Sequence, residues 1–134
     1  MTPLIIEPGE YSPKVVLDPA KNIFEFSGES YTENTRVFYM PILQWLEQYQ
    51  NALHQEKDKP GQSISRVFEF RFNYFNSTSA KFIMDVLMHL DRIAEEGYNI
   101  KAKWNYDKHN EDMKESGEEF AKLISVPFEF APIE

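Results

Sequence analysis

A change of hydrophobic period in the second half of the chain constrains the fold more than any other feature. Residues 64–73 alternate between apolar and polar side chains, which is typical of a β-strand with one buried face. From Ile83 to Ala94 the apolar positions follow the spacing of an amphipathic helix, and alternation returns at residues 98–104. A strand, a helix and a second strand in this order predict a right-handed crossover within a parallel or mixed sheet.

The rest of the chain extends this pattern. The other expected elements are strands at 14–18 and 22–26, helices at 35–54 and 108–123, and a last strand at 126–130. Pro41 lacks an amide proton, so the regular part of the first helix is expected to begin near Met40. Pro127 places the last strand near a sheet edge. The predicted fold is an α/β sandwich, a mixed sheet with covering helices in the order β-β-α-β-α-β-α-β.

Length and composition predict one packed domain over residues 1–134. Hydrophobic residues make up 42% of the chain and aromatic residues 15%, which is too much for a disordered protein. The one linker-like stretch, residues 55–62, is too short to separate domains. The absence of cysteine excludes disulfides, thiolate metal sites and a cysteine nucleophile.

The charge pattern argues against nucleic-acid and membrane partners. The net charge is −8, and no basic cluster resembles the footprint of a nucleic-acid-binding protein. No segment approaches the roughly 18–20 apolar residues that a membrane-spanning helix needs, and the N-terminus does not resemble a signal peptide. We therefore expect a cytoplasmic protein.

Motifs that carry catalysis are missing from the sequence. The three histidines form no pair at helical spacing, and no nucleophile or phosphate-binding motif occurs, so no metal, cofactor or catalytic residue is predicted. The alternative to a non-catalytic module is a small α/β enzyme or ligand-binding domain. Its site would be built around Asp85, Asp107 and His109.

A run of four polar residues, 76–79, lies where a predicted strand ends and a long helix begins. One interpretation is capping, because Asn, Ser and Thr side chains accept hydrogen bonds from the free amides of a first helical turn. The other is regulatory phosphorylation, because a helix N-terminus also accommodates a phosphate well. Both interpretations stay open on composition alone.

The helix that follows presents two methionines, Met84 and Met88, beside the predicted buried stripe, with Lys81 and Asp85 in the same segment. Methionines on a partly exposed face suit an adaptable protein–protein contact. Alternatively, this helix is simply buried over a wider face.

These segments together resemble the SiaC family of bacterial regulatory phosphoproteins over about residues 6–131. The resemblance rests on the blocks GESYTEN (28–34), FYMPILQWLEQY (38–49), FNYFNSTSAK (72–81), MD (84–85), WNYD (104–107), DM (112–113) and EEF (118–120). The family is similar to STAS domains, the fold of anti-sigma-factor antagonists, which implies a mixed sheet with packed helices.

The resemblance implies a partner-switching module and not an enzyme. A cognate Ser/Thr kinase would phosphorylate this protein and a PP2C-type phosphatase would reverse the reaction. The unmodified form would bind and activate a GGDEF diguanylate cyclase in cyclic di-GMP signalling. By position the implied acceptor is Ser77, with Thr78 second, supported by Asn76, Ser79 and Lys81. The partner-binding residues would be Lys81, Met84, Asp85 and Met88.

Overall fold

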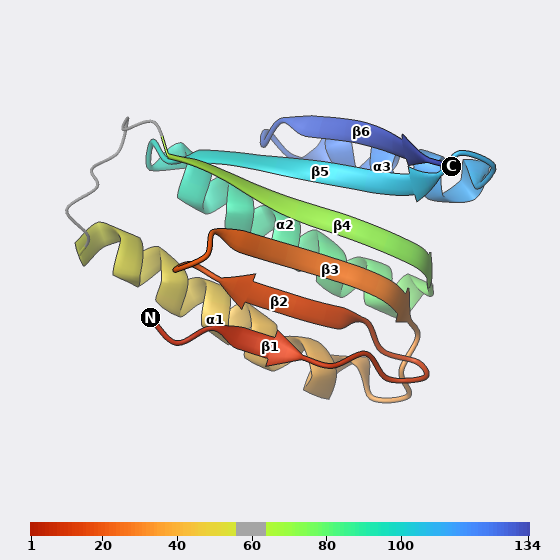
Figure 1. Cartoon of the computed structure of the whole chain (residues 1–134), viewed down its shortest axis with the longest axis horizontal. Helices are drawn as coiled ribbons and strands as arrows, with labels where there is room; N and C mark the ends of the chain where they lie inside the picture. Colours follow the sequence, from red (N-terminus) through yellow and green to blue (C-terminus); the bar gives the residue numbers. More distant parts are fainter. Residues whose placement is uncertain (56–63) are drawn as a thin grey trace.

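The computed structural model describes residues 1–55 and 64–134, and it folds them into a sheet of six strands with three helices (Figure 1). Along the chain these elements are β1 (Leu4–Ile6), β2 (Lys14–Asp18), β3 (Ile23–Ser30), α1 (Thr35–Gln55), β4 (Ser65–Phe75), α2 (Ser77–Glu95), β5 (Asn99–Asp107), α3 (Glu111–Leu123) and β6 (Phe128–Ile133). The predicted linker at 55–62 lies, beyond Gln55, outside the described residues.

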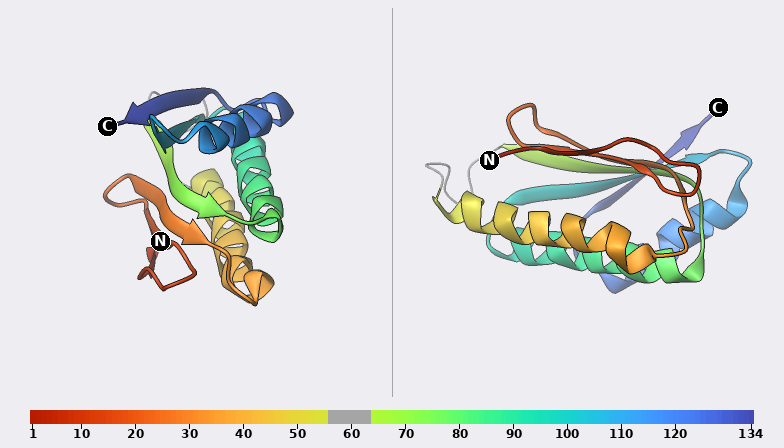
Figure 2. Two further views of the ribbon diagram at one scale, coloured as in Figure 1. Left: turned by 90° about the vertical axis from the view of Figure 1, so that its right-hand side faces the viewer. Right: turned by 90° about the horizontal axis from the view of Figure 1, so that it is seen from below.

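The strands lie side by side in the order of the sequence. β1, β2 and β3 pair antiparallel, whereas β3, β4, β5 and β6 pair parallel. Because each helical crossover advances in the same direction, right-handed connections place every helix on one face of the sheet. Figure 2 shows the helices as a single layer beneath the sheet. The predicted fold class, a mixed α/β sheet with covering helices, is confirmed.

The core lies between the sheet and the helix layer, and it is largely aromatic. Phe68 of β4 stacks on Phe24 with ring centroids 4.3 Å apart, and Phe70 stacks on Trp104 at 5.8 Å. The alternate positions face solvent on the other side of the sheet, as the period of two predicts. This arrangement leaves one face of the sheet uncovered by helices. It also places the carboxyl ends of the parallel strands β3, β4 and β5 together at one end of the sheet.

A β-bulge changes the direction of the side chains at the end of β4. Gly28 of β3 lies opposite Phe72, but the next residue, Glu29, lies opposite Tyr74, so Asn73 is the extra residue. Beyond the bulge the alternation is reversed. Tyr74 is 50% exposed, whereas Phe75 packs on the Trp104 ring of the core at 6.3 Å.

β1 and the start of α1 differ from the sequence predictions. β1 was not predicted, since three residues carry no recognisable period, and it forms by pairing with β2. The prediction that the regular part of the first helix begins near Met40 was wrong, because α1 is helical from Thr35 and contains Pro41. Pro41 and Val37 both lie on the exposed side of α1, so the carbonyl that proline leaves unpaired is on the side that water reaches.

The last strand agrees with another expectation. β6 lies at an edge of the sheet, as Pro127 predicted, although it begins two residues later than expected. In the described part of the chain, no helix is both long and apolar enough to cross a membrane.

Candidate functional site

The junction between β4 and α2 is held by Asn76, which caps the helix. Its side-chain Oδ1 accepts a 2.9 Å hydrogen bond from the Ser79 amide, and its carbonyl accepts one from Ala80, also at 2.9 Å. The amide of Asn76 itself donates to the carbonyl of Ser30 at 3.1 Å, which ties the junction to the end of β3. The capping interpretation of residue 76 is therefore confirmed.

The three hydroxyl residues of the first helical turn have different surroundings. Ser77 and Thr78 are exposed, whereas Ser79 is completely buried. The Ser30 hydroxyl donates to Ser79 Oγ at 2.9 Å and shares a 2.7 Å hydrogen bond with the Tyr39 hydroxyl. Ser77 and Thr78 are thus the hydroxyls at this junction that a modifying enzyme can reach.

The buried hydroxyls form a hydrogen-bonded chain from α1 through β3 to α2. Burial raises the pKa of Tyr39 to about 12, against a smaller opposing effect of the Ser30 hydrogen bond, so the phenol stays protonated at neutral pH. Neither Ser30 nor Tyr39 was among the predicted site residues. A signal did exist for the burial of Ser79, because it lies four residues before Ile83 and so continues the buried stripe of α2.

The free end of α2 favours an anion. The amides of Ser77 and Thr78 precede the first intrahelical hydrogen bonds, so the helix supplies them no acceptor. The first turn carries no acidic side chain, and the helix dipole places partial positive charge there. A phosphate on either hydroxyl would therefore meet compatible electrostatics without a change of fold.

Replacing Ser79 by alanine tests whether the buried chain holds this junction. The substitution removes the acceptor of the Ser30 hydroxyl inside the core, and we expect it to lower the free energy of unfolding by about 1–2 kcal/mol. Urea denaturation measures the loss. Ser77→Ala is the matched control, since an exposed serine should change stability by no more than about 0.5 kcal/mol. Equal stability of both variants would contradict a structural role for the Ser79 hydroxyl.

The predicted partner-binding residues lie along α2 with graded exposure. Lys81 is exposed, Met84 and Asp85 are half-buried, and Met88 is 42% exposed. Met84 packs against the edge of the core, so the wider-burial interpretation holds for this residue. Met88 and Lys81 remain available on the outer surface of the helix layer.

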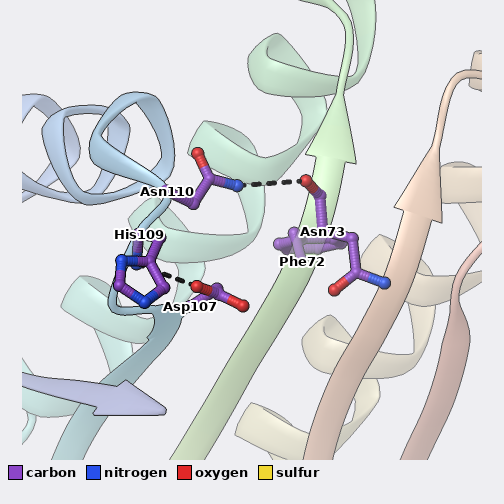
Figure 3. Close-up of a pocket in the computed structure, with 5 residues that line it drawn as sticks. All are labelled: Phe72, Asn73, Asp107, His109 and Asn110. Carbon is purple, nitrogen blue, oxygen red and sulfur yellow. Dashed lines mark hydrogen bonds between the residues drawn. The ribbon is translucent and has the colours of Figure 1, made fainter. Parts of the chain in front are cut away.

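The residues proposed for an alternative enzyme do not all converge. Asp107 and His109 line a hollow of about 460 Å³ at the carboxyl ends of β4 and β5, together with Phe72, Asn73 and Asn110 (Figure 3). Asp85 belongs to α2 and is not among the residues that line it. The three predicted residues therefore do not share one site.

The polar groups of this hollow already serve local structure. Asp107 Oδ1 accepts from the His109 amide at 2.8 Å, and Asn110 Oδ1 accepts from the Met113 amide at 3.1 Å to cap α3. The Asn110 side-chain amide donates to the Asn73 carbonyl at 3.5 Å, as Figure 3 shows. Within residues 1–55 and 64–134, no cluster of three or more His, Asp or Glu side chains could hold a metal ion.

Comparison with known proteins gives one consistent result. The family model described as SiaC family regulatory phosphoprotein matches residues 6–133. An uncharacterized protein of Pseudomonas aeruginosa strain UCBPP-PA14 is 28% identical over 128 residues, which are 96% of this chain and 94% of that protein.

Solved structures agree with the family match. Apo-SiaC from Pseudomonas aeruginosa superposes with a TM-score of 0.81 at 24% identity, covering 98% of this chain and 99% of that one, which shows the shared fold. A second structure is that of the diguanylate cyclase SiaD in complex with its activator SiaC, from the same organism. It superposes with a TM-score of 0.82 at 26% identity, covering 97% of this chain and 99% of that one.

Proposed function

Because this chain belongs to the SiaC family of regulatory phosphoproteins, we propose that it is a non-catalytic module of a partner-switching system. Its single domain, residues 1–134, acts in the cytoplasm. A cognate Ser/Thr kinase phosphorylates it and a PP2C-type phosphatase removes the phosphate. The unphosphorylated form binds and activates a GGDEF diguanylate cyclase, and the phosphorylated form releases it.

The observation that carries this proposal is the pair of exposed hydroxyls on a capped helix start. Ser77 is the acceptor, and Thr78 is the second choice. Asn76 and the buried Ser79 support the site by fixing the first turn, while Lys81 supplies a positive charge one helical turn further on. A phosphate there adds about −1.5 to −2 charges at neutral pH beside amides that accommodate it.

The proposal for the partner draws on the relative whose structure contains a cyclase. That SiaC protein is described as the activator of SiaD, and the same fold presents α2 here. The docking face consists of Lys81, Met84, Asp85 and Met88. Met88 is more exposed than Met84, and unbranched methionine side chains adapt well to a partner surface.

Release upon phosphorylation follows from electrostatics at the edge of this face. Docking would bury part of the first turn, so a dianion on Ser77 would have to lose water or meet the partner at close range. About 2.7 kcal/mol is enough to weaken an affinity a hundredfold. No rearrangement of the fold is required.

The alternative, a small enzyme or ligand-binding domain, has less support. Asp107 and His109 share a hollow, but Asp85 does not line it. The Asp107 carboxylate already accepts a hydrogen bond from the His109 amide in the turn that follows β5. A binding site should instead offer polar groups that converge on a ligand.

Phosphosite mapping tests the acceptor. The wild-type chain is incubated with ATP and a kinase that modifies it, and the product is analysed by mass spectrometry. We expect one phosphate, on Ser77, and loss of phosphorylation in Ser77→Ala. Phosphate on Thr78 in the wild-type chain would transfer the role to the second choice. Phosphate at neither position would contradict the proposal.

A further inference from the structure

Three tyrosines form a row at the end of the sheet where β3 and β4 have their carboxyl ends. Tyr31 meets Tyr11 edge to face with ring centroids 5.1 Å apart, and it meets Tyr74 in the same way at 5.5 Å. The Tyr31 amide donates to the Tyr11 carbonyl at 2.9 Å, which fixes the two segments together. Tyr11 is 47% exposed and Tyr74 50% exposed, so a large part of the row faces water.

The row borders the junction that carries Ser77. Tyr74 precedes Ser77 by three residues, and it owes its outward direction to the bulge at Asn73. Tyr31 follows Ser30, whose carbonyl receives the Asn76 amide. Ser77 therefore follows the row by three residues along the chain and begins the helix that carries the proposed docking face.

Carboxylates flank the row. Glu29 lies opposite Tyr74 in the pairing of β3 with β4. Partial burial raises the pKa of Tyr31, and the nearby carboxylates of Glu29 and Glu10 raise it further. Tyr74 also lines a hollow of about 180 Å³ that includes Asp112 at the start of α3. The surface beside the acceptor is thus both aromatic and acidic.

The basic residues of the adjoining strands lie further back. Lys14 on β2 and Arg71 on β4 are both level with Ser27, two residues before Glu29. The negative charges of Glu10 and Glu29 beside the row therefore remain available to a partner. Aromatic faces flanked by carboxylates attract guanidinium and ammonium groups, through cation–π contacts and charge-assisted hydrogen bonds.

We propose that the tyrosine row, Tyr11, Tyr31 and Tyr74 with Glu10 and Glu29, is the docking surface for the kinase that phosphorylates Ser77, and that the kinase meets it with Arg or Lys side chains. This inference rests on the proposed function. A kinase must bring cations to the acceptor in order to hold the phosphates of ATP, and the acidic surface of the row, whose Tyr74 precedes Ser77 by three residues, complements them.

Steady-state phosphorylation tests the surface, with the full chain as the varied substrate and a kinase that modifies the wild-type chain. We expect Tyr74→Ala and Glu29→Lys to raise KM about tenfold each and to leave kcat nearly unchanged. Tyr74→Phe retains the ring and should keep the wild-type KM. Glu95→Lys makes the same charge change at an exposed position at the far end of α2, and should also keep it.

A second readout separates kinase docking from cyclase docking. Unphosphorylated Glu29→Lys should activate the cyclase as the wild-type chain does, whereas Met88→Glu should lose activation and keep its phosphorylation KM. Weakened cyclase activation by the row variants would overturn the proposal, because the row would then be a cyclase contact. Glu29→Lys, at an exposed position, carries the test if Tyr74→Ala does not fold.

Different results would overturn the proposed docking surface and the proposed phosphorylation site. An unchanged KM in both row variants, with Ser77 still phosphorylated, would overturn this docking surface and leave the acceptor intact. A wild-type chain that no kinase phosphorylates on residues 77 or 78 would overturn both. A parallel fall of kcat and rise of KM with loss of the native near-ultraviolet circular dichroism would reveal misfolding in Tyr74→Ala, and Glu29→Lys then decides.

Discussion

Ser77→Asp is expected to weaken binding of the unphosphorylated chain to its cyclase about a hundredfold, or about 2.7 kcal/mol. The carboxylate places a negative charge on the exposed first turn of α2, one helical turn before Lys81 of the docking face. Burying that charge against a partner costs desolvation that the serine hydroxyl does not. Ser77→Ala adds no charge and should bind with wild-type affinity, as isothermal titration calorimetry can show.

Two controls make this result specific. An acidic residue in a first helical turn interacts favourably with the helix dipole, so Ser77→Asp should not destabilise the fold. Ser65→Asp adds the same charge at an exposed position and should bind normally. Ser65 lies at the start of β4, whereas the first turn of α2 follows the end of that strand. If Ser77→Asp binds as tightly as Ser65→Asp, charge at the acceptor does not control the contact.

Gly117→Val is expected to cause the largest loss of stability, about 3 kcal/mol in the free energy of unfolding. A Cβ atom at Gly117 would lie 2.5 Å from the Cδ1 and Nε1 atoms of Trp104, closer than packed atoms approach. The Trp104 ring is completely buried, and its Nε1 donates to the Met113 carbonyl at 3.0 Å, so it cannot move aside without loss. Glycine here allows α3 to approach β5.

Urea denaturation of Gly117→Val measures this effect, with Glu118→Val as the matched control at an exposed position of the same helix. Both variants introduce a β-branched residue into α3, but Gly117→Val also removes a glycine, so helix propensity alone would make it the more stable of the two. A midpoint for Gly117→Val equal to that of Glu118→Val would contradict close packing of α3 on the Trp104 ring.

The periods of the sequence were sufficient to predict the fold class, because alternation and helical spacing survive unchanged in most elements. They failed where tertiary pairing overrides local pattern. β1 depends on its partner β2, and α1 extends before Pro41 because Thr35 and Tyr39 are buried. The bulge at Asn73 reverses the alternation, so parity alone would have placed Tyr74 in the core and Phe75 outside.

The candidate site was partly predictable. The polar run at residues 76–79 indicated the capped helix start, but it did not by itself distinguish the three hydroxyls. Their separation depends on the phase of α2, which directs Ser79 to the core and leaves Ser77 and Thr78 outside. The tyrosine row brings Tyr11, Tyr31 and Tyr74 together from three separate segments, a proximity that only the sheet register creates.

Whether phosphorylation of Ser77 controls the proposed cyclase contact can be decided by one affinity comparison. The chain is phosphorylated by its kinase, the Ser77 phosphoform is purified, and its dissociation constant for the cyclase is measured beside that of the unmodified chain. We expect the phosphoform to bind at least about a hundredfold more weakly. Equal dissociation constants for the two forms would contradict it.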